Sequence, residues 1–227
     1  MDLKPLFVFP KWSNKVVLGL LLILATTPLY AGALIAYAFD PVTLNVGYQP
    51  VQPVPYSHAL HAGQLGIDCR YCHNTVEKAG FAAIPPTETC MNCHKSIKPD
   101  SELLKPVRDS WATGKPIPWL KIHDLPDYVY FNHAAHVNAA VSCVECHGNI
   151  NHMEQVSQVQ PLNMAWCLQC HRDPTSHIRP KDQVTNLDWV PTLKEGQSIA
   201  EAKEELGKQL KEQYHINPST DCVTCHR

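Results

Sequence analysis

The sequence has few of the residues that fill an ordinary protein interior. Phe, Trp and Tyr together make 8% of its 227 residues, whereas proline alone occurs 19 times. A proline-rich chain with so few large apolar side chains builds a poor conventional core, so another group must supply part of the interior. An excess of positive charge is also lacking, because the formal net charge is −2. The sequence therefore gives no electrostatic signal for nucleic-acid binding, and no nucleic acid is expected as a partner.

What the sequence has instead is cysteine in a fixed pattern. Its 10 cysteines fall into five C-x-x-C-H motifs, and none is left over. Two thiols followed by a histidine form the attachment sequence of c-type haem, in which the histidine is the proximal ligand of the iron. The predicted haem-binding residues are Cys69, Cys72, His73, Cys90, Cys93, His94, Cys143, Cys146, His147, Cys167, Cys170, His171, Cys222, Cys225 and His226.

Two other uses of paired cysteines are weaker interpretations. A redox dithiol explains C-x-x-C but not the histidine after it, and zinc sites built from four cysteines leave all five following histidines unexplained. Five covalently bound c-type haems account for the whole pattern. Their apolar faces would also replace the missing core, which predicts a mainly α fold with much irregular structure and little or no sheet.

An apolar run without a charged residue covers residues 16–39. A helix of this length, rising ~1.5 Å per residue, can cross the ~30 Å hydrocarbon layer. Lys4, Lys11 and Lys15 precede the run, so the positive-inside rule places residues 1–15 in the cytoplasm. The competing interpretation is a cleaved signal peptide, but this run exceeds the ~7–15 apolar residues typical of such a peptide. We therefore expect a retained anchor.

These expectations divide the chain into four parts. We predict a cytoplasmic segment at residues 1–15 and a transmembrane helix at residues 16–39. A proline-rich linker is predicted at residues 40–55, followed by a periplasmic multihaem cytochrome c domain at residues 56–227. The protein would lie in the inner membrane with a single span and its haems on the outer side. Pro28 should kink the span. In the last part, Ser198 and Glu201 predict a capping box at the start of an amphipathic helix.

A repeated element precedes two of the motifs. Residues 56–61 read YSHALH and residues 131–136 read FNHAAH, each an aromatic residue followed by two histidines three positions apart. Two C-x-x-C-H motifs follow each element, which indicates a duplicated dihaem module with the fifth motif outside it. Histidines at i and i+3 project from successive helical turns, so they cannot both reach the open face of one iron. We therefore predict four distal ligands to four irons: His58, His61, His133 and His136.

The fifth iron needs a ligand from elsewhere in the chain. Met153 is the predicted one, with His177, His123 and Met164 as alternatives. A methionine ligand would raise the reduction potential of that haem relative to haems with two histidine ligands.

Three longer stretches extend the pattern beyond single motifs: YSHALHAGQLGIDCRYCH, YVYFNHAAHVNAAVSCVECHG and MAWCLQCHR. With the anchor and five motifs, they resemble the pentahaem cytochrome c subunit of alternative complex III, a bacterial quinol oxidoreductase. The paired histidines are similar to those of class III multihaem cytochromes c, where the two serve different haems. The resemblance implies electron transfer from menaquinol in the respiratory chain. It also implies an iron–sulfur subunit, a monohaem cytochrome c and integral membrane subunits as partners, with a terminal oxidase as eventual acceptor.

Three functions are compatible with the pattern. The favoured one is an electron-transfer subunit whose irons all have two axial ligands, so that the subunit performs no bond chemistry itself. A multihaem reductase needs one iron with an open distal position, and high-spin ferric haem would favour it. A stand-alone quinol dehydrogenase that feeds periplasmic reductases needs a quinol site, for which one charge-free span provides little.

Overall fold

The computed structural model describes residues 10–38 and 45–226, which fall into two units divided after Leu44. Most of the predicted cytoplasmic segment, the start of the predicted linker, and residues 39 and 227 lie outside this part of the chain. The second unit carries all five motifs and is called the motif domain below. Each unit is described by itself.

The first unit contains the helix α1 (Ser13–Ala38), which matches the predicted apolar span closely. None of its residues is buried, and by length and composition it is long and apolar enough to cross a membrane. Pro28 lies inside it and cannot donate a backbone hydrogen bond. The hydroxyls of Thr26 and Thr27 donate to the carbonyls of Leu22 and Ile23, at 2.8 and 2.7 Å. Their polar groups are thus satisfied within the helix, as an apolar environment requires.

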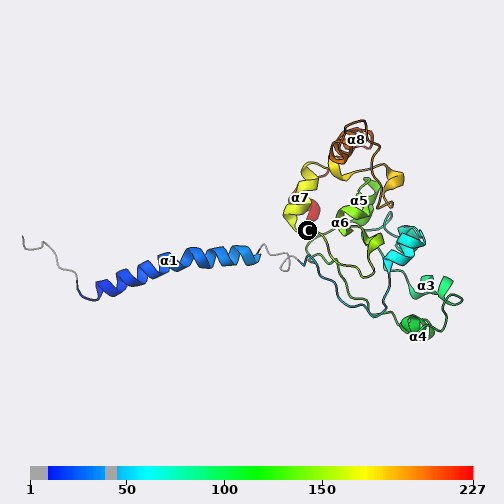
Figure 1. Cartoon of the computed structure of the whole chain (residues 1–227), viewed down its shortest axis with the longest axis horizontal. Coiled ribbons are helices and arrows are strands. Elements are labelled where there is room, and N and C mark those ends of the chain that lie inside the picture. Colours follow the sequence, from blue (N-terminus) through cyan, green and yellow to red (C-terminus); the bar gives the residue numbers. More distant parts are fainter. Residues whose placement is uncertain (1–9, 39–44, 227) are drawn as a thin grey trace, which may run out of the picture. The chain divides into compact units, whose positions relative to one another are not determined.

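The motif domain consists of short helices joined by long irregular connections, and its described residues form no β-strand (Figure 1). Its elements are η1 (Ala59–Gln64), α2 (Cys69–Cys72), α3 (Thr87–His94), η2 (Glu102–Leu104), α4 (Lys105–Thr113), α5 (His133–Asn138), α6 (Cys143–His147), η3 (Ile150–His152), α7 (Met164–Arg172), η4 (Thr175–His177), η5 (Lys181–Gln183), α8 (Ile199–Gln213) and α9 (Cys222–Cys225). The predicted helical fold without a sheet is confirmed for these residues.

Each of the five motifs forms, or ends, a short helix. α2, α6 and α9 begin at the first cysteine of their motifs, whereas α3 and α7 contain a motif in their last turn. Side-chain caps fix two of these starts: Asp68 accepts from the backbone N–H of Arg70 at 2.8 Å, and Asn163 accepts from that of Trp166 at 2.9 Å. One helical turn brings the two thiols of a motif to the same side of the helix.

The buried core of the motif domain is small and surrounds the start of the third motif. Ala140 is fully buried and Ser142 is 1% exposed, whereas no Phe, Trp or Tyr among the described residues is buried. The Ser142 hydroxyl donates to the carbonyl of Val184 at 2.6 Å, and the Arg179 backbone N–H donates to that of Ala140 at 3.1 Å. Smaller buried groups lie elsewhere, with Val107 in α4 and Leu210 in α8, so ordinary side chains form a few small packed regions, which agrees with the composition.

The chain from residue 45 packs on the motif domain, although residues 40–55 were predicted to be an extended linker. Gly47 donates its backbone N–H to the carbonyl of Gln158 at 2.7 Å. The side-chain amides of Gln49 and Gln155 each donate to the other residue's backbone carbonyl, at 2.7 and 3.1 Å. The compact unit thus begins at Asn45 rather than residue 56, because these glutamines satisfy backbone groups that an isolated extended segment leaves to water.

The helix α8 covers one side of the motif domain and begins with the predicted capping box. The Ser198 hydroxyl accepts from the backbone N–H of Glu201, whose carboxylate accepts from the Ser198 N–H at 2.9 Å. Its buried face includes Gly207, where an added Cβ would lie 1.7 Å from the carbonyl oxygen of Thr175. The absence of a side chain there lets α8 approach η4 closely.

Candidate haem-binding site

Four of the five motif histidines have their ring orientation fixed by a backbone carbonyl. Each donates its Nδ1–H, which leaves Nε2 with the lone pair that a metal needs. The donor–acceptor pairs are His73 to Ala83 at 2.8 Å, His94 to Ile97 at 3.0 Å, His171 to Ser219 at 2.6 Å and His226 to Tyr128 at 3.2 Å.

His147 of the third motif is the exception, and its environment is the most buried of the five. Burial, reinforced by nearby His123 and His133, lowers the pKa of His147 to about 3. A deeply buried imidazole is disfavoured in its charged form, so His147 is neutral at physiological pH. A neutral ring is the state in which a histidine can bind a metal.

The two repeated elements have the same local geometry. Tyr56 stacks on His61 with ring centroids 4.4 Å apart, and Phe131 stacks on His136 at 4.5 Å. The same two aromatic rings meet the first histidine of their own element edge-on, both at 4.8 Å. One aromatic residue thus positions both imidazoles of its element. This explains why an aromatic residue precedes each pair in the sequence.

The second histidine of each element also has the same proton placement. His61 donates Nδ1–H to the carbonyl of Ser57, and His136 donates to that of Asn132, both at 2.8 Å. His133 donates instead to Gly80, at 2.9 Å, in the segment that follows the first motif. Nδ1 of His58 is buried without a hydrogen-bond partner in the described structure.

Three of these histidines face a motif histidine at the separation expected for two axial ligands of one metal. A histidine nitrogen binds a metal at ~2 Å and the ring centroid lies ~1.1 Å behind it, so two axial imidazoles have centroids roughly 6.2 Å apart. The observed centroid distances are 6.2 Å for His61 and His94, 6.4 Å for His133 and His147, and 6.0 Å for His136 and His171.

The remaining pair is His58 and the first motif. Burial lowers the pKa of His58 to about 4, and the next contribution comes from His73. The two imidazoles are therefore close enough to interact electrostatically. In each element, the first histidine lies by the first motif of its module and the second histidine by the second motif.

Apolar side chains near the motifs remain exposed, which also fits a porphyrin. Phe81 follows the first motif and is 84% exposed, and Val223 lies within the fifth motif and is 74% exposed. A porphyrin attached at the neighbouring thiols would cover such surface. The residues present thus fit c-type haem in ligand type, ring spacing, proton placement and apolar surroundings.

The candidates for the fifth distal ligand lie near other motifs. The Met153 methyl packs near Gly148, which directly follows the third motif, and the His123 ring lies 4.3 Å from that of His147. His177 donates Nδ1–H to the Glu145 carboxylate at 2.9 Å, also within the third motif. Met164 begins α7, which contains the fourth motif. Met153 therefore stays a predicted ligand, and its methyl lies beside the third motif rather than the fifth.

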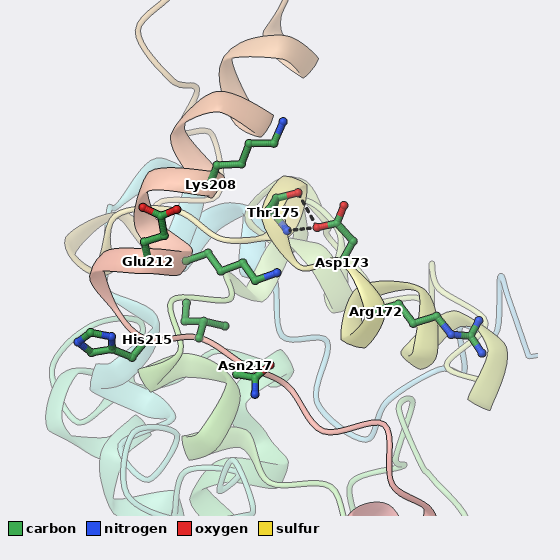
Figure 2. Close-up of a pocket in the computed structure, with 9 residues that line it drawn as sticks. Arg172, Asp173, Thr175, Lys208, Glu212, His215 and Asn217 are labelled. Carbon is green, nitrogen blue, oxygen red and sulfur yellow. Dashed lines mark hydrogen bonds between the residues drawn. The ribbon is translucent and has the colours of Figure 1, made fainter.

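An open hollow of about 750 Å³ lies between the end of α7, η4 and the end of α8 (Figure 2). On one side Thr175 donates both its backbone N–H and its hydroxyl to the Asp173 carboxylate, which lowers the pKa of that carboxyl. The lining is mainly charged and polar, and consists of Arg172, Asp173, Thr175, Lys208, Lys211, Glu212, His215, Ile216 and Asn217. It suits water and ions better than the apolar ring of a quinol.

Sequence reasoning missed the groups that orient the ligands. The carbonyl acceptors of Ala83 and Ser219 come from irregular connections, and backbone atoms carry no sequence signature. It also missed the contacts of Glu145, whose carboxylate accepts from His177 and from nearly buried Arg179. The available signal for these contacts was Glu145 itself, a charged residue between the two cysteines of the third motif.

The motifs, the orientation of the histidines and the spacing of their rings are those of a multihaem cytochrome c. Comparison with known proteins supports this class. The chain is 29% identical over 213 residues to the multihaem cytochrome c subunit of menaquinone reductase from Nitratidesulfovibrio vulgaris. The aligned region covers 88% of this chain and 89% of that relative. No family model matches the chain.

Proposed function

We propose that the protein is the electron-transfer subunit of a membrane-bound quinol oxidoreductase and carries five covalent c-type haems. The observation that carries the proposal is the set of three imidazole pairs with ring centroids 6.0–6.4 Å apart, each joining a motif histidine to a histidine of the repeated elements. A haem with both axial positions filled transfers electrons without binding a substrate. The repeated local geometry supports a duplicated dihaem module.

The residues of the chain would hold the haems in the following way. The two cysteines of each motif attach the porphyrin, and the motif histidine is the proximal ligand. His58, His61, His133 and His136 are the distal ligands of the first, second, third and fourth haem, in that order. Bound haem supplies one-electron chemistry at its iron. The protein fixes the neutral tautomer of each ligand through carbonyls such as those of Ser57 and Asn132.

The membrane side of the proposal rests on α1 and on the relative. A menaquinone-linked relative over most of the chain favours a quinone as the redox partner within the membrane. α1 carries no Asp, Glu, Lys, Arg or His within its apolar stretch 16–38, which favours partner subunits as the place of the quinone site and of any proton path. The resemblance to alternative complex III favours an iron–sulfur subunit, a monohaem cytochrome c and integral membrane subunits as those partners. It also favours the periplasmic side for the motif domain and a terminal oxidase as the downstream acceptor.

The name of the relative favours a second candidate direction of electron flow. A menaquinone reductase delivers electrons to menaquinone, whereas the complex III resemblance implies that menaquinol is the donor. The same haems could serve either direction, because a relay is reversible and the potentials of its partners decide the net flow.

The test uses the full-length protein purified from membranes with whatever subunits accompany it. Alkaline pyridine spectra, normalised to protein, should give five c-type haems for each chain. A menaquinol analogue should then reduce these haems anaerobically in the intact complex but not in the isolated chain. If the menaquinol analogue also reduces the haems of the isolated chain, the protein is instead a stand-alone quinol dehydrogenase. If only a menaquinone analogue reacts, by reoxidising prereduced haems, the reverse direction of electron flow is favoured.

A further inference from the structure

The first and second motifs lie next to each other. The side-chain amide of Asn92, between the cysteines of the second motif, donates to the hydroxyl of Tyr71, between those of the first, at 3.2 Å. His58 and His61, which face these two motifs, are three residues apart in one element. The Asn92–Tyr71 bond joins the two motifs directly, and one short element holds both facing histidines, so two porphyrins bound there would be immediate neighbours.

The first motif also lies next to the third. Two consecutive residues connect them: the Val184 carbonyl accepts from Ser142, directly before the third motif, and the Thr185 hydroxyl donates to Asp68, directly before the first. These bonds are 2.6 and 3.1 Å long. In addition, His133, which faces the third motif, is oriented by the Gly80 carbonyl in the segment after the first motif.

The third and fourth motifs are joined through α5. His133 and His136 lie one turn apart on this helix, and their rings face His147 of the third motif and His171 of the fourth. Because the helix is short and both histidines have fixed orientations, the two facing motifs cannot be far apart.

The fifth motif continues from the fourth. His171 of the fourth motif donates to the Ser219 carbonyl at 2.6 Å, in the segment that leads into the fifth motif. On its other side, the Tyr130 N–H donates to the Cys225 carbonyl at 2.8 Å, directly before Phe131, which stacks on His136. The fifth motif therefore borders the residues that surround the fourth haem position.

We infer that the five haems form one unbranched row in the order second, first, third, fourth, fifth, so that electrons enter and leave the subunit at the second and fifth haems. This order differs from the order of the motifs in the sequence. The inference rests on the proposed function, because it requires a haem at each motif. Each transfer oxidises one ferrous iron and reduces its ferric neighbour, with no atom or proton exchanged.

The exposure of the attachment cysteines supports the same two ends independently. Of the 10 cysteines, Cys93 and Cys222 are exposed and the others are partly buried. Cys93 belongs to the second motif and Cys222 to the fifth, the two ends of the row. The middle of the row coincides with the buried core at Ala140 and Ser142. Haem edges at the ends are thus the ones that an external donor or acceptor can approach.

The test breaks the row at one place and supplies electrons at one end. A ruthenium photosensitiser attached at Asp127→Cys, an exposed position beside Tyr128, would inject electrons next to the fifth motif of the full-length, haem-loaded chain. Cys143→Ala with Cys146→Ala removes the third haem, after which only the fourth and fifth should be reduced in the fast phase. Four haems remain in this variant, and the first and second should no longer be reduced in the fast phase. The absorbance change of that phase should therefore be half of that expected for the four haems.

The matched control removes a haem from the far end instead. With Cys90→Ala and Cys93→Ala, the second haem is absent but all four remaining haems should still be reduced in the fast phase. Fast reduction of all haems in the variant without the third would overturn the row. If the unaltered chain lacks five haems, the proposed function fails instead. Should a variant not mature, a density map of the unaltered protein decides: an iron of the fifth motif closest to that of the first or second would refute the order.

Discussion

Replacing His136 by alanine should convert the fourth haem from low spin to high spin. His136 lies 6.0 Å from His171 between ring centroids, and among the described residues no other imidazole is in ring contact with His171. Removal of His136 would leave that iron with its proximal ligand alone. With one haem at each of the five motifs, as proposed, about one fifth of the total haem should change spin state. Electron paramagnetic resonance of the ferric, full-length protein measures that fraction.

The same substitution should cost a limited amount of stability. It removes the stacking of Phe131 on the ring, worth ~0.5–1.5 kcal/mol, and the hydrogen bond to the Asn132 carbonyl, worth a similar ~0.5–1.5 kcal/mol. The free energy of unfolding should therefore fall by about 1–3 kcal/mol. The protein should still fold, so added imidazole should enter the vacated space and restore the low-spin signal.

Two companion variants make this prediction specific. His61→Ala in the first repeated element should have the same effect on the second haem, because His61 has the same ring contacts and the same carbonyl bond as His136. His215→Asn should leave every haem low spin. Asparagine tolerates the φ of 55° at that position, and His215 pairs with no motif histidine in the described structure. If His136→Ala stays fully low spin without added imidazole, our axial pairing is wrong.

Three further changes test the packing and electrostatics of the motif domain. Gly207→Ala should lower stability by about 1–2 kcal/mol in urea unfolding, because its Cβ would lie 1.7 Å from the Thr175 carbonyl oxygen and this outweighs a better helix propensity. Ser198→Ala should cost ~1 kcal/mol through loss of the N-cap of α8. Hydrogen bonds from Arg70 lower the pKa of Asp68 to about 2, so their stabilisation is present above pH ~4 and is lost as the pH falls towards 2. Arg70→Ala should therefore destabilise the protein clearly at pH 7 and much less near pH 2, measured by urea unfolding at both values.

Two of these tests have a control of their own. Gln209→Ala, at an exposed position of α8, raises helix propensity without meeting η4 and should not lower stability, unlike Gly207→Ala. Equal effects of the two substitutions would mean that close approach of the elements is not what Gly207 provides. An Arg70→Ala effect that is as large at pH 2 as at pH 7 would assign its role to packing rather than to the charge of Asp68.

Local chemistry determined the attachment residues and the paired histidines from the sequence. A C-x-x-C-H motif acts within one helical turn, and the repeat of YSHALH and FNHAAH is visible without a fold. The capping box at Ser198 and the apolar helix up to Ala38 are local in the same sense. The predicted linker differs, because the bonds between Gln49 and Gln155 join residues far apart in the chain.

The sequence by itself was enough to predict that groups attached at five motifs supply the interior, since the scarcity of large apolar residues and the ten paired cysteines are properties of the chain alone. Only the tertiary structure decided which histidine faces which motif and in what order the motifs adjoin. Connections of irregular backbone, such as residues 184 and 185 between the first and third motifs, place residues distant in sequence side by side. Many of the hydrogen bonds that fix these placements, such as that of Ser142 to Val184, end on backbone carbonyls, and backbone carbonyls are the same at every position of a sequence.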